Sequence, residues 1–187
     1  MRILRDDSHL FHVTEWNPER QRVGSATYLI TFVCYGSHLH GEEGAVDRFH
    51  NVPRTPTLAA DPARLKKAQS IMKWAPYSLD ECRRHIVLRG LLRACERREW
   101  GLIAAHVRTN HVHAIVQGNR SAEQMMSALK AYASRALNEA RLDTAPRRHW
   151  AYHGSTRYLW TRAQVERAVR YVVAEQGEAM AVHFPVL

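Results

Sequence analysis

Two histidines two residues apart, His111 and His113, form the pattern in this sequence best suited to chemistry. They lie in an apolar run over 111–116 that predicts a β-strand, and alternate side chains of a strand project from one face, roughly 7 Å apart. Two imidazoles at that spacing can bind one divalent cation. The alternative is a hydrogen-bonded pair of histidines at a sheet edge. A second pair, His38 and His40, lies in a glycine-flanked stretch that indicates a loop, so it is the weaker metal candidate.

A tyrosine near the C-terminus is the candidate nucleophile. Tyr171 and Glu175 lie one turn apart in a predicted helix, about 40° around its axis, while Gln176 lies about 140° from Tyr171. A phenol with a pKa of about 10 needs a metal-polarised phosphate or a base before it attacks at neutral pH. Tyr171 could instead only pack beside the apolar stripe of its helix. Tyr132 competes as nucleophile, but Ala136 stands four residues after it.

The elements that must position these residues follow from hydrophobic patterning. Strands are predicted at 27–35, 102–107, 111–116, 150–152 and 156–160, the last two flanking a turn at Gly154 and Ser155. Helices are expected to begin at the caps Ser78, Ser121 and Thr161, each three residues before Glu or Gln. This order predicts an α+β fold: a ferredoxin-like antiparallel βαββαβ sheet with helices on one face and a C-terminal tyrosine-bearing helix.

The chain divides into an N-terminal segment, 1–24, and a single domain, 25–187. That domain carries an insertion at about 37–77, because a connection so long is rarely part of a core. A short basic helix is expected within the insertion at 64–74.

The charge indicates a polyanionic partner. The 187 residues include 27 Lys and Arg against 18 Asp and Glu, a formal charge of +9. Guanidinium and aromatic groups alternate near the predicted fourth strand, a mixture that holds phosphates and stacks bases, although solvated arginines at strand ends would look the same. The candidate DNA-binding residues are Lys130, Arg135, Arg147, Arg148, Arg157, Tyr158 and Trp160.

Other sequence features favour a cytoplasmic protein, associated with the nucleoid when bound to DNA. No apolar run reaches transmembrane length, so no membrane partner is expected, and the N-terminus does not resemble a signal peptide. Three widely spaced cysteines fit a reducing compartment better than a zinc cluster.

Taken together, these motifs resemble the single-tyrosine HUH transposases, in particular the REP-associated tyrosine transposases. The resemblance covers residues 25–182 and rests on four stretches in order: 27–32, 110–113, 158–160 and 171–175. It implies a ferredoxin-like domain that cleaves and rejoins single-stranded or hairpin DNA. The family reaction proceeds through a 5′-phosphotyrosine intermediate and uses Mg²⁺ or Mn²⁺.

The resemblance also assigns roles to single residues. It implies that His111 and His113 are metal ligands and that Tyr171 is the nucleophile. The family's third ligand is usually Gln or Asn four residues after the tyrosine; Glu175 stands there, with Gln176 as the alternative. Because relatives often donate the tyrosine helix across a two-fold interface, a homodimer with a hinge at 154–160 is an expectation, and a monomer remains open.

The function expected from these residues is therefore metal-dependent cleavage and rejoining of single-stranded DNA, as by a transposase or a single-strand endonuclease and ligase. Two alternatives remain at this point. One is a domesticated protein that binds structured DNA without turnover. The other is a metal-dependent hydrolytic nuclease that uses water in place of Tyr171.

Overall fold

The computed structural model of the chain describes residues 24–43 and 58–184. In chain order its elements are β1 (Ala26–Cys34), α1 (Pro62–Ser70), α2 (Glu81–Arg98), β2 (Gly101–Val107), β3 (His111–Gly118), α3 (Ala122–Glu139), β4 (Trp150–Tyr158), α4 (Arg162–Ala174) and β5 (Ala181–His183). The predicted N-terminal segment, apart from Gly24, and positions 44–57 of the predicted insertion lie outside the described residues.

The strands form one antiparallel sheet in the order β4-β1-β3-β2-β5. The first four strands and the helices between them reproduce the predicted βαββαβ arrangement, so the α+β, ferredoxin-like prediction is confirmed. The short strand β5 was not predicted. It pairs with β2 through Ala105 and Val107 and so extends the sheet beyond the ferredoxin-like core.

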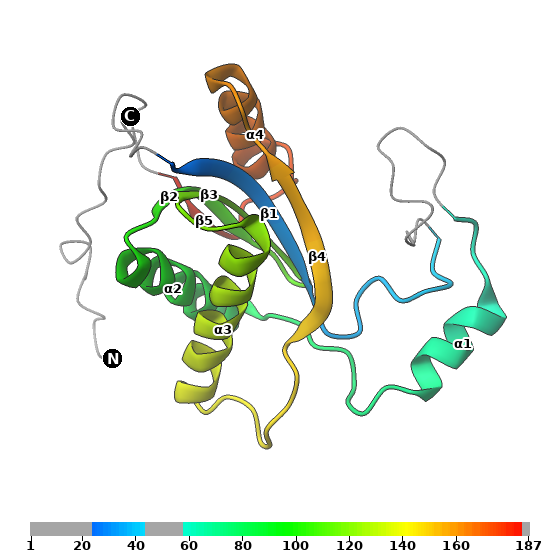
Figure 1. Ribbon diagram of the computed structural model, residues 1–187. Helices are drawn as coiled ribbons and strands as arrows, with labels where there is room; N and C mark the ends of the chain where they lie inside the picture. The colour runs from blue at the N-terminus through cyan, green and yellow to red at the C-terminus, as the bar shows by residue number, and fades with distance from the viewer. Residues whose placement is uncertain (1–23, 44–57, 185–187) are drawn as a thin grey trace.

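Helices α2 and α3 cover one face of the sheet, and α4 lies on the other (Figure 1). Beneath α2 and α3 the core is apolar and closed, with Phe32, Leu91 and Leu129 each fully buried. The two helices cross closely at Gly90, where an added Cβ would stand 2.9 Å from the Cα of Ala133. A side chain at position 90 would therefore push the helices apart.

On the opposite face α4 buries a smaller apolar cluster. Val165, Ala168 and Val172 recur at helical spacing and pack on Leu29 and Ile115 of the sheet. This stripe fixes one side of α4 against the sheet and leaves the next side, which carries Tyr171, at the edge of the contact. None of the described helices is long and apolar enough to cross a membrane.

Two of the three predicted helix starts are confirmed. Ser121 and Thr161 each form a capping box with the Gln three residues later, which satisfies backbone donors that the first helical turn leaves free. The predicted cap at Ser78 is wrong. Asp80 caps α2 by accepting the backbone N–H of Arg83 at 2.8 Å, because a carboxylate is as good a cap as a hydroxyl and lies next to the helix.

The predicted turn at Gly154 and Ser155 is also wrong, because β4 runs through it as one edge strand paired with β1. Gly154 serves close packing instead of a turn. A Cβ there would lie 2.4 Å from the carbonyl oxygen of Thr31 and 2.5 Å from the sulfur of Met126. Glycine is required here because Thr31 and Met126 approach the backbone closely. Short-range sequence patterns do not reveal such a contact.

Candidate active site

His111 and His113 project from β3 on the face that carries α4. In the register of the sheet His113 stands opposite Thr31 of β1 and His106 of β2. The two imidazole rings lie edge to face with centroids 4.8 Å apart. The strand and the shared face predicted for this pair are therefore confirmed, whereas its role as a metal-binding pair stays a prediction.

Each imidazole is oriented through its Nδ1 atom. The Nδ1 of His111 lies 2.7 Å from the side-chain oxygen of Asn110, which can only accept, so Nδ1 donates and Nε2 keeps its lone pair. The Nδ1 of His113 lies 2.8 Å from the hydroxyl of Thr31. A hydroxyl donates or accepts, so either tautomer of His113 keeps this bond. His111 thus keeps a lone pair on Nε2, whereas the Nε2–H of His113 donates to the side-chain oxygen of Gln176. Metal binding through the Nε2 of His113 would require its other tautomer, which the Thr31 hydroxyl also accommodates.

Gln176 brings an amide to the same point. Its Oε1 lies 3.1 Å from the Nε2 of His113, and its Nε2 donates to the carbonyl oxygen of Tyr171 at 3.2 Å. The same amide also lies close enough to His111 to raise its pKa slightly, against the larger effect of burial. Because the amide nitrogen is committed to a carbonyl, the amide oxygen faces the histidines.

Glu175 is placed differently. The helix α4 ends at Ala174, and Glu175 follows as its C-cap with an exposed side chain. The i+4 face shared with Tyr171 therefore does not extend to Glu175, and Gln176 reaches the histidines after the chain leaves the helix. The geometry brings together Tyr171, His111, His113 and Gln176, and leaves Glu175 outside this group.

Tyr171 stands over the histidine pair from the last turn of α4. Its ring centroid is 5.5 Å from that of His113, at 72° to it, and its side chain is 39% exposed. Within the described residues its hydroxyl has no hydrogen-bond partner in the chain, so it is free to meet a ligand. Tyr132, by contrast, packs with the α2 and α3 core on the other face, under the guanidinium of Arg135.

The surroundings keep both histidines neutral. Burial, with smaller effects from Arg108 and from the neighbouring histidines, lowers the pKa of His111 to about 4. Burial and then the neighbouring His111 lower the pKa of His113 to about 4 as well. Neutral imidazole is the form that binds metal, so the pair needs no deprotonation at neutral pH.

His106 supports the site and was missed by the sequence analysis. It is fully buried, its Nδ1 lies 2.9 Å from the carbonyl oxygen of Val172, and its Nε2 accepts the backbone N–H of Met180 at 3.2 Å. It thereby joins β2 to Val172, the residue after Tyr171, and to Met180, four residues after Gln176. The sequence did contain an indication of this role, because His106 lies within an apolar predicted strand and a buried polar side chain needs hydrogen-bond partners.

No three His, Cys, Asp or Glu side chains form a group that could hold a metal in the part of the chain that the structure describes. The arrangement here is two imidazoles and an amide oxygen. Their chemistry still fits a divalent cation, because the amide oxygen lies 3.1 Å from the Nε2 of His113, the two imidazole rings are in contact, and each histidine has an outer partner at Nδ1 that orients it.

The predicted DNA-binding residues fall into two groups. Lys130 and Arg147 are engaged within the chain. The ammonium of Lys130 donates to the carbonyl oxygens of Ala151, Tyr152 and His153 at 3.0–3.2 Å, and burial lowers its pKa to about 8. Arg147 donates to the carbonyl oxygen of Ala75 at 2.6 Å. Lys130 therefore stabilises the contact between α3 and β4, whereas Arg147 joins the chain before β4 to the segment that precedes α2. Neither is proposed below as a phosphate contact.

The other predicted DNA-binding residues lie at the surface. Arg135, Arg148 and Arg157 are exposed. Tyr158 and Trp160 stack in parallel, with centroids 4.3 Å apart and Trp160 74% exposed. An open aromatic face of this kind can stack an unpaired base, so the prediction for these five residues stands as a prediction.

No protein-family model and no curated protein sequence matches the chain. Its fold is similar to solved structures at low sequence identity, and two of them are described here. One is a REP-associated tyrosine transposase bound to a REP hairpin, with 10% identity and a TM-score of 0.45 over 80% of this chain and 66% of that one. The other, a "putative transposase" from Deinococcus radiodurans R1, has 13% identity and a TM-score of 0.42 over 83% of this chain and 96% of that one.

Proposed function

We propose that this protein cleaves and rejoins single-stranded DNA at hairpin-forming sequences, by metal-dependent transesterification with Tyr171 as nucleophile. One observation supports the proposal above all others: two imidazoles and an amide converge within one chain beside a tyrosine whose hydroxyl is unoccupied by other groups of the described chain. That combination suits attack on a phosphodiester.

The proposed ligands of Mg²⁺ or Mn²⁺ are the Nε2 atoms of His111 and His113 and the Oε1 of Gln176. A carbonyl oxygen suits both ions, and three protein ligands leave coordination positions for phosphate oxygens. The chemistry that such an ion supplies is polarisation of the scissile phosphate. Glu175, the third ligand favoured from the sequence, is replaced in this proposal by Gln176 because of where α4 ends.

In the proposed reaction the phenolic oxygen of Tyr171 attacks the phosphorus in line with the leaving 3′-oxygen. The new bond is the tyrosine O–P bond and the broken bond is P–O3′, so the phenol proton is balanced by the proton gained by the 3′-hydroxyl. A 3′-hydroxyl then reverses the step and releases Tyr171. His113 and Gln176 position the tyrosine segment, through the ring contact and through the bond to the Tyr171 carbonyl.

The proposed site is complete within one protomer. Tyr171 meets the histidines of its own chain, so the geometry requires no partner, and the homodimer stays a prediction. Light scattering at high concentration, compared with activity at the same concentration, decides between the two states.

The proposal is tested by incubating the protein with single strands and hairpins from the flanks of its own gene, with Mg²⁺, Mn²⁺ or a chelator. The expected product is a protein–DNA adduct that survives denaturation and requires the metal. Cleavage without any adduct would instead indicate a hydrolytic nuclease. Binding without cleavage in every metal would indicate a DNA-binding protein without turnover.

A further inference from the structure

Helix α1 is built unlike the other helices of the chain. It has nine residues, none of them buried, and it stands away from the rest of the domain (Figure 1). Helices shorter than about 12–15 residues are marginal in water when no tertiary packing supports them. Its N-terminus is nevertheless well defined, with Asp61 as cap and Pro62 in the first turn. The helix is thus ordered locally but has no apolar face to bury.

The segment around α1, residues 58–76, which we call the arm, is strongly basic. It contains Arg64, Lys66, Lys67 and Lys73 against the single carboxylate of Asp61. A helix that docks on a protein groove presents several apolar anchors at helical spacing. In the described arm Ile71 is the one large apolar side chain that is more than half exposed, so charge dominates this surface. Charge of this kind suits a phosphate backbone.

The arm is fixed to the domain at its root. The backbone of Tyr77 donates to the carbonyl oxygen of Tyr35 at 2.8 Å, and the Lys73 backbone donates to the Tyr35 hydroxyl at 3.1 Å. Arg147 holds the Ala75 carbonyl and lies over the Tyr77 ring, 4.6 Å from its centroid. These contacts orient the arm before any ligand binds. The entropic cost of ordering it is therefore not paid from the binding free energy.

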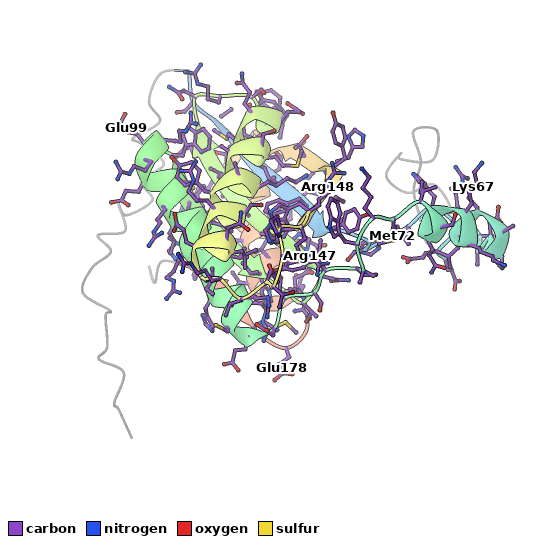
Figure 2. All side chains as sticks on the ribbon, turned by 90° about the horizontal axis from the view of Figure 1, so that it is seen from below. Lys67, Met72, Glu99, Arg147, Arg148 and Glu178 are labelled. Carbon is purple, nitrogen blue, oxygen red and sulfur yellow. The ribbon has the colours of Figure 1, made fainter. Side chains whose placement is uncertain are left out.

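A cavity of about 530 Å³ lies where the arm joins the domain, between Trp74 of the arm and the α3–β4 edge. Arg148 lies on the wall of this cavity and has an exposed side chain. Figure 2 shows Arg147 and Arg148 where the arm joins the domain, and Met72 lies on the way from these arginines to Lys67 of α1. The cavity also lies at the His111 end of the sheet, since Trp150 in its wall pairs with Cys34, whose backbone donates to Asn110.

We propose that this arm surface is a second contact for the DNA, which holds the phosphodiester backbone away from the reacting phosphate. The surface consists of Arg64, Lys66, Lys67, Lys73 and Arg148. The proposal rests on the proposed function for the identity of its ligand, because a DNA strand held at the catalytic site would supply the phosphate backbone that this basic surface suits. In this proposal the arm binds the substrate, and the site on the α4 face of the sheet carries out the reaction.

The test compares two triple variants that lose the same charge. One, Arg64→Gln with Lys66→Gln and Lys67→Gln, changes the arm. The other, Arg89→Gln with Arg97→Gln and Arg98→Gln, changes exposed positions of α2 and controls for net charge. Since α1 buries nothing and Gln is a good helix former, both variants should fold, which circular dichroism checks.

Affinity is measured on hairpin DNA with long single-stranded flanks and on a short strand of about ten nucleotides around the cleaved phosphate. The arm variant should bind the long DNA about tenfold more weakly, with a slope of log affinity against log salt shallower by about two, as three lost phosphate contacts predict. Its binding and adduct formation on the short strand should equal those of the unaltered protein. The α2 control should stay within about twofold on both DNAs.

Equal losses in the two variants would mean that only net charge matters and would overturn the proposal, as would an arm variant with unchanged affinity for the long DNA. An equal loss on the short strand would also overturn it, because the arm would then act at the catalytic site. If the unaltered protein forms no adduct while the arm variant still loses affinity selectively, the proposed function fails and the arm surface stands.

Discussion

The two faces of β3 are built for different purposes. Val112, Ala114 and Val116 point toward α2 and α3 and are fully buried. On the other face Ile115 is buried under α4, but His113 and His111 lie where that helix stops. The difference follows from helix length: α2 and α3 have 18 residues each, whereas α4 has 13 and ends beside the histidines, where Gln176 of the following segment contacts His113.

The two faces of the sheet differ in what their side chains contribute. The closed face contains apolar side chains, whose loss leaves cavities. The face that carries α4 contains Thr31, His106 and His113, whose polar side-chain atoms all have hydrogen-bond partners, so their burial costs little in the folded state and they stay oriented. We therefore expect changes on one face to lower the free energy of unfolding, and changes on the other to lower activity first.

The largest effect on activity is expected at the strand histidines. His111→Ala or His113→Ala removes one of three proposed ligands, so Mn²⁺ affinity should fall more than about 100-fold, beyond the loss usual for outer-shell partners. Calorimetric titration with Mn²⁺ measures this directly, and adduct yield should vanish in parallel.

Two controls sharpen the contrast with the closed face. His38→Ala changes an exposed histidine of the Gly36–Gly41 loop and should leave Mn²⁺ affinity and adduct yield unchanged. Leu129→Ala should lower the free energy of unfolding by about 2–5 kcal/mol and keep metal affinity in the folded protein. Normal Mn²⁺ binding in His113→Ala would contradict the proposal that the two histidines bind the metal.

The third ligand is tested by two neighbouring substitutions. Gln176→Ala removes the amide that lies 3.1 Å from His113 and should weaken Mn²⁺ binding at least about tenfold. Glu175→Ala changes an exposed carboxylate and should have little effect. Mn²⁺ titration of the two variants side by side decides the matter, and the opposite ranking would restore Glu175 as the ligand favoured by the sequence.

His106 should act as a positioning residue. His106→Ala leaves the Val172 carbonyl and the Met180 N–H without their partner, which should lower the free energy of unfolding by about 1–3 kcal/mol. Because the Tyr171 segment loses its anchor, the adduct-forming rate should fall more than Mn²⁺ affinity does. Urea denaturation and single-turnover kinetics measure the two effects, and His106→Gln, which can both donate and accept, should recover part of each.

The last of these effects is a pH dependence of stability, which leaves activity at neutral pH unchanged. Burial lowers the pKa of His106, and that of His111 and His113 to about 4, whereas unfolded histidines titrate at about 6.5. Between these values the unfolded chain binds more protons than the folded chain. The free energy of unfolding of the metal-free protein should therefore decrease as the pH falls from about 6.5 to about 4. Urea denaturation at several pH values checks this, and a constant value across the window would contradict it.

Much of the fold could be predicted because it follows local rules. Alternation of apolar residues predicted the central strands, and the capping pairs at Ser121 and Thr161 predicted two helix starts. The strand that carries His111 and His113 was predicted for the same reason. The turn assigned to Gly154 was wrong because a glycine in a strand reports either a turn or a close neighbour, and only the packing of Thr31 and Met126 distinguishes them.

The choice between Glu175 and Gln176 as the neighbour of the histidines could not be made in the same way. The choice of Glu175 assumed that α4 continues, and a helix end is uncertain by one or two residues in sequence. Here one residue decides which side chain lies beside the histidines, which is Gln176 and not Glu175. The structural contacts of Lys130 were likewise invisible, because its three carbonyl partners lie about twenty residues along the chain.

The central claim is that the hydroxyl of Tyr171 forms the covalent bond to DNA. Tyr171→Phe removes one oxygen and keeps the ring beside His113, so folding, Mn²⁺ binding and affinity for single-stranded DNA should be retained. The measurement is adduct formation on a denaturing gel with Mn²⁺, alongside Tyr132→Phe, which changes a tyrosine on the other face. We predict no adduct for Tyr171→Phe and a normal yield for Tyr132→Phe. An adduct that persists in Tyr171→Phe would contradict the account.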